Sequence, residues 1–249
     1  MLEVWDLYVQ ALLKMGKKEE ALDGLKKAIA AAPEESTHLF VTVAEISLSL
    51  GRVEEAERHA EIARKRGDPA AYDVLANIHL TRREWDAAEK DARASIAARP
   101  RKRLPYLILA RVEVSRNHLP EAFALVEKAR ALPGRAENEA IQNFHFIRGD
   151  ILGRMGRPAE AEPEFLEEIR LFPDNLDAYA GLVALYASEG RTEDARSTIR
   201  KLLTVNTNQD AYVRAINALS VVGDRVEAER VRRAAAARFR SDRRFARAA

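Results

Sequence analysis

The segment Gly16-Lys17-Lys18-Glu19-Glu20-Ala21 decides how this chain is organised, because its pattern returns along the sequence. It recurs as Gly51-Arg52-Val53-Glu54-Glu55-Ala56, with a turn residue, a few polar residues and then an alanine. The alanines that close the seven copies are Ala21, Ala56, Ala88, Ala122, Ala161, Ala195 and Ala228. They are spaced by 32 to 35 residues, except for 39 between Ala122 and Ala161. A period of this length indicates an array of stacked helical units.

Each period predicts two amphipathic helices joined by a turn. In the first period, Trp5, Tyr8 and Leu12 recur at i, i+3 and i+7 and therefore lie on one face of a helix. The small residues Ala21 and Ala28 lie on one face of the next helix and allow it to pack closely. A single helix pair cannot bury both faces alone, so the pairs are expected to stack into one continuous core.

Aligned on those alanines, the chain resembles the tetratricopeptide repeat (TPR) family, whose 34-residue unit is a helix–turn–helix. The family's large aromatic position holds Trp5, Phe40, Tyr72, Tyr106, Tyr179 and Tyr212, with His145 in repeat five. Its turn position holds Gly16, Gly51, Gly156, Gly190 and Gly223, with Arg83 and Asn117 as substitutes. The late small position of the second helix departs from the pattern at Glu168 and Leu202.

The resemblance extends from Leu2 to about Arg240 and implies an all-α fold, a right-handed superhelical solenoid of antiparallel helix pairs. It predicts repeats 1–4 in residues 2–132, an irregular connection at 133–139, repeats 5–7 in residues 140–240 and a basic C-terminal tail at 241–249. The first repeat begins at once, without a preceding polar cap. This favours a repeat region of a longer protein, and a short protein with a frayed first helix is the alternative.

Composition argues against several classes of function. The 249 residues include 41 Lys+Arg against 39 Asp+Glu and no cysteine, which excludes thiolate metal sites and cysteine nucleophiles. The five histidines have no metal-ligand spacing, and the recurring carboxylate pairs fall in the first turn of a helix, where the helix dipole favours anions. We therefore expect no metal, no cofactor and no enzymatic activity. The near-neutral charge also disfavours a nucleic-acid or membrane-surface partner for the whole chain.

In TPR proteins the first helices line a concave groove that usually binds peptides, so the resemblance implies a protein or peptide partner here. The residues one place after the small packing position would face that groove: Gln10, Glu45, Asn77, Arg111, Asp150, Ala184 and Asn217. A mostly polar ladder suits recognition of an extended chain, whereas the plain alternative is that these side chains only face water. The resemblance implies no two-carboxylate clamp of the kind found in chaperone-binding members. The matching positions in repeat three hold Asp73 and Asn77, and only Asn77 is a residue type that the clamp uses.

The middle of the chain places charges where its neighbours have apolar residues. Arg148 and Glu113 fall at positions that are otherwise mostly apolar, and His145 replaces the aromatic. One hypothesis is a polar pocket formed by a Glu113–Arg148 pair with His145 nearby, since lone buried charges are costly. The alternative is a one-residue shift of register, which would turn Phe144 and Ile147 inward and Arg148 outward.

The leading functional prediction is a non-enzymatic scaffold that binds a peptide or partner segment. The segment from Arg225 to Ala249 contains nine arginines and three acidic residues, and Phe239 and Phe245 lie among the arginines. This segment suggests a nucleic-acid or anionic-surface binder as one alternative, and terminal capping is the favoured explanation.

The stretch Glu168–Asp174 is also similar to TPR tails of bacterial sulfatase-like proteins, which implies an accessory domain of a larger, exported enzyme. Without that parent a cytoplasmic location is the default. Self-association through exposed end repeats is a further alternative.

Overall fold

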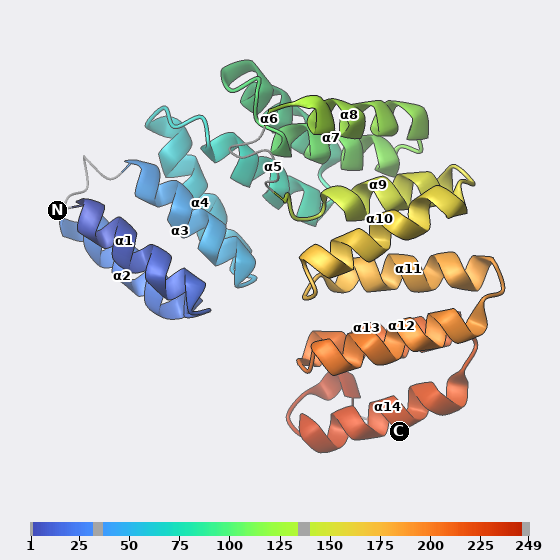
Figure 1. Cartoon of the computed structure of the whole chain (residues 1–249). Helices are drawn as coiled ribbons and strands as arrows, with labels where there is room; N and C mark the ends of the chain where they lie inside the picture. Colours follow the sequence, from blue (N-terminus) through green and yellow to red (C-terminus); the bar gives the residue numbers. More distant parts are fainter. Residues whose placement is uncertain (1, 32–36, 134–139, 246–249) are drawn as a thin grey trace. The chain divides into compact units, whose positions relative to one another are not determined.

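The computed structural model describes residues 2–31, 37–133 and 140–245. In these ranges the chain forms 14 α-helices, one short 3-10 helix and no strand (Figure 1). The chain divides into two compact units, Met1–Pro133 (unit 1) and Gly134–Ala249 (unit 2). The connection predicted at 133–139 lies, apart from Pro133, outside the described residues. The all-α fold of antiparallel helix pairs is confirmed, and the first helix of each pair is called helix A and the second helix B.

Unit 1 contains four helix pairs. They are α1 (Leu2–Lys14) with α2 (Lys18–Ala31), α3 (Thr37–Ser49) with α4 (Val53–Lys65), α5 (Ala71–Arg82) with α6 (Trp85–Ala98), and α7 (Leu104–Ser115) with α8 (Leu119–Ala131). Within the unit, α2, α4 and α6 each also pack on helix A of the next pair. The signature residues Ala21, Ala56, Ala88 and Ala122 are completely buried. Small side chains at these positions let the helices approach, so the core runs along the unit as predicted.

The turn inside each pair explains the residues at the predicted turn position. Gly16 and Gly51 have φ angles of 73° and 74°, in the left-handed region that ends a helix. Arg83 and Asn117 take the same conformation, with φ angles of 61° and 63°. The two substitutes foreseen from the alignment therefore form the same turn, at some cost in backbone strain for a side chain with a Cβ atom.

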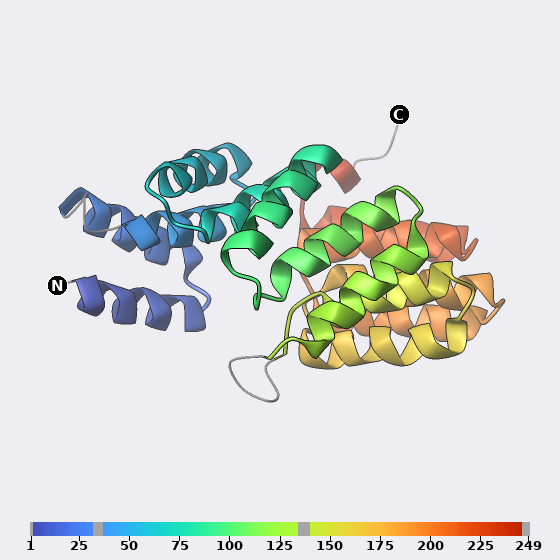
Figure 2. The same cartoon turned by 90° about the horizontal axis from the view of Figure 1, so that it is seen from above.

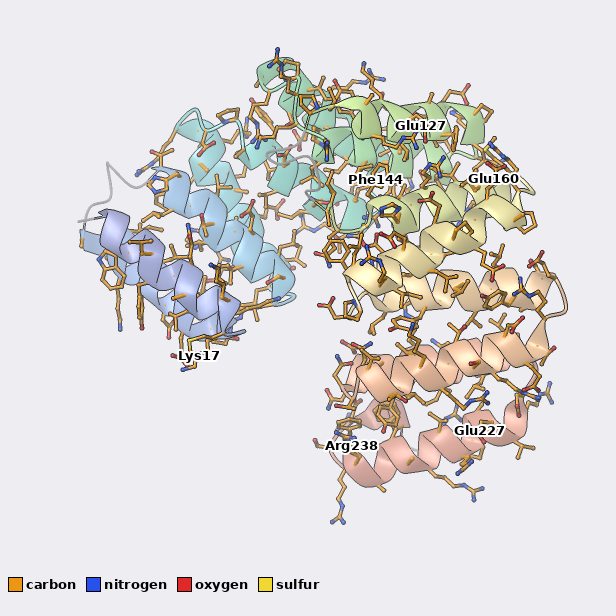
Figure 3. All side chains as sticks on the ribbon, in the orientation of Figure 1. Lys17, Glu127, Phe144, Glu160, Glu227 and Arg238 are labelled. Atoms are coloured by element: carbon orange, nitrogen blue, oxygen red, sulfur yellow. The ribbon has the colours of Figure 1, made fainter. Side chains whose placement is uncertain are left out.

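Unit 2 contains three helix pairs and a short terminal helix. They are α9 (Phe144–Arg154) with α10 (Pro158–Leu171), α11 (Leu176–Ser188) with α12 (Thr192–Val205), α13 (Gln209–Val221) with α14 (Arg225–Arg238), and η1 (Arg243–Phe245). Figures 1 and 2 show these helices as one stack. In Figure 3, Phe144 at the start of α9 and Arg238 at the end of α14 lie on one edge of the stack, and Glu160 and Glu227 lie on the other. The A helices of unit 2 therefore all begin on the edge that contains Phe144.

Ion pairs join neighbouring repeats beside the turns. In each case an arginine near the turn binds an acidic residue on helix B of the preceding repeat: Arg52–Glu19 (2.8 Å), Arg82–Glu57 (2.7 Å), Arg116–Glu89 (2.7 Å) and Arg191–Glu162 (2.6 Å). Each pair is partly exposed, so it adds at most about 1 kcal/mol to stability. Among the carboxylates in the first turns of the B helices, Glu19 takes part in one of these pairs.

Candidate functional site

The predicted groove residues of unit 1 lie on its four A helices. Each follows a buried residue at the close-packing position, such as Ala44 before Glu45 and Ala110 before Arg111. Gln10, Glu45 and Arg111 are exposed, and Asn77 is half-buried. The side chain of Asn77 donates to the backbone carbonyl of Asp73 over 3.1 Å, so part of its hydrogen-bonding capacity is used within its own helix.

Glu45, on α3, interacts electrostatically with Asp73 and Arg99 of the next helix pair. Its side chain is exposed, yet burial among surrounding atoms raises its pKa, with a further contribution from the Asp73 carboxylate and an opposing one from Arg99. Asp73 itself is nearly buried and accepts hydrogen bonds of 2.5 Å from Ser95 Oγ and from Arg99 Nη2. Asp73 therefore ties the start of α5 to the end of α6.

In unit 2 the corresponding positions line two hollows. The first, here called the Phe165 notch, has a volume of about 240 Å³ and is lined by Asp150, Gly153, Arg154, Phe165, Gly181, Ala184, Leu185 and Ser188. The second, called the aspartate pocket, has a volume of about 610 Å³ and is lined by Gln142, Asn143, Asp174, Asn175, Leu176, Asp177, Asp210, Val213, Arg214 and Asn217. The predicted groove residues Asp150 and Ala184 thus share one hollow, and Asn217 lies in the other.

The notch exists because two helices lack side chains where Phe165 enters. Phe165 belongs to α10 and is almost completely buried between α9 and α11. A Cβ atom at Gly149 would lie 3.1 Å from the Phe165 ring, and one at Gly181 only 2.5 Å from it. Contacts of 2.5 Å are not tolerated between carbon atoms, so glycine at position 181 allows the ring to reach the notch.

The polar pocket predicted around Glu113, His145 and Arg148 is only partly assembled by the described contacts. His145 Nδ1 lies 2.7 Å from Glu164 Oε2, and Arg148 binds the other oxygen of Glu164. Burial acts to raise the pKa of Glu164, but the hydrogen bond from His145 and the charge of Arg148 outweigh it, so the pKa is lowered. Glu113 belongs to unit 1, where it contacts Arg116 and His118. The Glu113–Arg148 pair would join the two units and stays a prediction.

The alternative of a shifted register agrees with the structure in one respect. Phe144 and Ile147 are buried, as that alternative required. Gly149 and Leu152, however, are also buried at their expected positions, and only 15% of the Arg148 side chain is exposed. Phe144 and Ile147 therefore point inward in the regular register, and Arg148 is kept there by Glu164.

Glu168 forms a second polar site that the alignment marked only as a departure. Its side chain is completely buried, and its carboxylate accepts from the backbone N–H of Asn143 (2.6 Å) and of Phe146 (3.2 Å) and from Asn175 Nδ2 (2.7 Å). Asn143 precedes α9 and its own side chain does not cap the helix. Glu168 therefore supplies the N-terminal cap of α9 from helix α10.

The aromatic residues of the Arg-rich C-terminus pack onto repeat seven. Phe245 is 2% exposed, its ring lies 5.9 Å from that of Phe239, and Phe239 lies 5.5 Å from Tyr212. Arg244 binds Asp242 and Asp210, both at 2.7 Å. Base-stacking proteins present exposed rings to nucleic acid. The packing of Phe245 instead agrees with the favoured expectation, that this segment covers the end of the array.

The first helix of unit 1 carries an exposed aromatic residue. Tyr8 is 49% exposed, whereas the residues at the same repeat position, Val43, Leu75, Leu109 and Leu182, are 0 to 5% exposed. Next to it, a hollow of about 490 Å³ is lined by Trp5, Tyr8, Glu20, Asp23, Gly24 and Lys27. Self-association at this end stays a prediction, which light scattering at several protein concentrations tests.

In residues 2–31, 37–133 and 140–245, no three His, Asp or Glu side chains are placed to hold a metal ion. None of the helices described is both long enough and apolar enough to cross a bilayer.

The stacked helix pairs, left-handed turns and alanine-lined core define a helical-repeat protein, a class that presents surfaces to other proteins. Sequence profiles described as tetratricopeptide repeat match residues 2–35, 74–136 and 154–219. Together these profiles match more than half of the chain, which belongs to the tetratricopeptide repeat family. Its fold is that of a protein-interaction scaffold. No curated protein matches the chain in sequence.

Solved structures of TPR proteins share the fold. A thermophilic TPR protein of Thermus thermophilus is 23% identical, with a TM-score of 0.63, over 74% of this chain and 98% of its own. A tetratricopeptide repeat protein of Parabacteroides merdae is 16% identical, with a TM-score of 0.63, over 98% of this chain and 95% of its own. A chain of the APC/C hetero-tetramer Cut9–Hcn1 is 15% identical, with a TM-score of 0.75, over 98% of this chain and 48% of its own. These matches do not bear on the sulfatase-like resemblance, which stays a prediction.

Proposed function

We propose that this chain is a non-enzymatic scaffold that binds an extended segment of a protein partner along the A helices of unit 2. The observation that carries the proposal is that the Phe165 notch and the aspartate pocket both lie along α11. Ala184 and Leu185 line the first, and Leu176 and Asp177 line the second. A groove with an apolar recess and polar groups beside it matches the way extended peptides are held, by side-chain pockets and by contacts to the peptide backbone.

The amide side chains of the aspartate pocket support recognition of a peptide backbone. Asn217 and Gln142 are exposed there, and neither has a hydrogen-bond partner among the described residues. A carboxamide carries both a donor and an acceptor and can therefore bind an N–H and a C=O group of an extended chain. These two residues are available without loss of any described contact.

A selection from a random peptide library on the intact chain tests the proposal. Hydrogen exchange with a selected peptide should show protection in α9, α11 and α13, with little change in the convex helices α12 and α14. Replacing Asn217 with Ala should weaken the selected peptide several-fold, since a buried peptide–amide hydrogen bond contributes about 1 kcal/mol. Peptides that bind but protect only α12 and α14 would contradict a groove function.

A further inference from the structure

The two hollows of unit 2 differ in chemistry, and their order along one helix restricts what can bind. We infer that the partner segment is cationic, with an apolar side chain for the Phe165 notch and a lysine or arginine three to four residues away for the aspartate pocket. This inference rests on the proposed groove function and specifies its ligand.

The Phe165 notch accepts an apolar side chain. The Phe165 ring forms the base of the notch. The small residues Gly153, Gly181 and Ala184 have no side-chain atoms beyond Cβ to fill the space beside that ring. The charged residues at its rim, Asp150 and Arg154, bind each other at 3.0 Å. Neither charge then needs a partner from the ligand. A hollow of about 240 Å³ has room for one branched aliphatic side chain and too little for a folded domain.

The aspartate pocket provides negative charge for a cation. Three carboxylates line it, and Arg214 is the one basic residue among its described lining. Two of the carboxylates are already bound, Asp177 to Arg214 (2.5 Å) and Asp210 to Arg244 (2.7 Å). Asp174 is exposed and has no ion-pair or hydrogen-bond partner among the described residues. A basic side chain of the ligand would complete this set, with Asp174 as its main contact.

The distance between the two hollows sets the spacing in the ligand. Asp177 and Ala184 are about 10 Å apart along α11, because an α-helix rises about 1.5 Å per residue. An extended chain advances about 3.3 Å per residue, so that distance corresponds to three residues of the ligand. Asp174 precedes the helix and adds up to one residue more. Asn217 also lines the aspartate pocket, where its carboxamide can bind the backbone of the ligand.

Fluorescent nine-residue peptides with blocked ends test the inference by polarisation with the full chain. Each places leucine and a variable residue three positions apart, in either order, in a serine and glycine background. The variable residue is lysine, glutamine or glutamate. We expect the lysine peptide to bind about five-fold more tightly than the glutamine peptide, with the glutamate peptide weakest. The lysine preference should shrink as salt rises, since exposed charges are screened.

Two variants with matched controls locate the effect. Asp174→Asn should make the affinities for the lysine and glutamine peptides nearly equal, and should leave the affinity for the glutamine peptide unchanged. The control Glu121→Gln removes an equal charge from α8 and should leave the preference for lysine intact. Ala184→Leu fills the notch with a side chain at an exposed position and should weaken every peptide at least ten-fold. Ala159→Leu on α10 makes the same change outside the hollows and should have no effect. Thermal melts confirm that each variant is folded.

The outcomes separate this inference from the groove function. If Ala184→Leu abolishes binding but lysine is not preferred over glutamine and glutamate, or Asp174→Asn leaves the preference intact, the cationic ligand is refuted and the groove function stands. If no designed peptide binds while library peptides protect the groove helices, the stated ligand is again refuted. If Ala184→Leu does not change the affinity of the bound peptides, and these peptides protect only the convex helices α12 and α14, both proposals fail.

Discussion

Replacing Glu168 with Ala should destabilise unit 2 by about 3 kcal/mol. The carboxylate is completely buried and accepts three hydrogen bonds, from the N–H groups of Asn143 and Phe146 and from Asn175. Hydrogen bonds to a charged group contribute about 1.5 to 3 kcal/mol each, so the gross loss is at least about 4.5 kcal/mol. Alanine recovers about 1.5 kcal/mol, because it favours helix and removes the cost of burying a charge.

Urea unfolding followed by circular dichroism measures this change in the free energy of unfolding. Glu168→Gln keeps an acceptor for Asn143 but turns an N–H₂ group toward Phe146, so it should cost about 1 to 2 kcal/mol. The neighbour Glu167 is partly exposed and pairs with Arg170, which is exposed. Glu167→Ala should therefore cost less than about 0.5 kcal/mol.

Hydrogen exchange shows whether the loss is local. Without its cap, the first turn of α9 should open more readily, and the amides of residues 143–147 should exchange faster than those of α13. A loss below about 1 kcal/mol for Glu168→Ala, or unchanged exchange at the start of α9, would refute the reasoning. In that case water, rather than the carboxylate, would satisfy the N–H groups of the first turn.

Three more perturbations test other parts of unit 2. Gly181→Ala places a Cβ atom 2.5 Å from the Phe165 ring and should cost about 1 to 3 kcal/mol in thermal unfolding; an unchanged Tm would show that the ring moves freely. Burial and a hydrogen bond to Glu162 raise the pKa of Tyr186 to about 12. The stability that Tyr186 contributes is complete below pH 10 and lost as pH rises toward 12, so Tyr186→Phe should remove that part of the pH dependence. Phe245→Ala should cost about 3 kcal/mol and speed exchange in α14, because the buried ring is lost; exchange as slow as in the parent chain would mean that the ring does not cover this helix.

The repeat pattern predicted the fold because the determinants of a helix pair are local. Helix periodicity, a turn residue and small packing residues all act within one repeat of the chain. Arg83 and Asn117 illustrate this, since their place in the alignment predicted turns, and the structure has left-handed turns there with φ angles of 61° and 63°.

The candidate site shows what the alignment could and could not give. The alignment named Asp150, Ala184 and Asn217 as groove residues, which stays a prediction, and in the structure these residues line two hollows. It gave no sign of the Phe165 notch, because the depth of that notch depends on how a ring from one helix meets glycines on two others. The alignment also gave no sign of the role of Glu168, since the two backbone N–H groups that it binds lie 22 and 25 residues earlier in the chain.

The sequence by itself determined the number of helix pairs, their turns and the family, because these follow from spacing that each repeat carries within itself. Tertiary structure alone decided which charges are used and which are free. His145 and Arg148 share Glu164, Asp73 is engaged by Ser95 and Arg99, and Asp174 is left open in a hollow. The physical reason is that pairing depends on distances of about 3 Å between side chains of different helices, and those distances are set only when the helices pack.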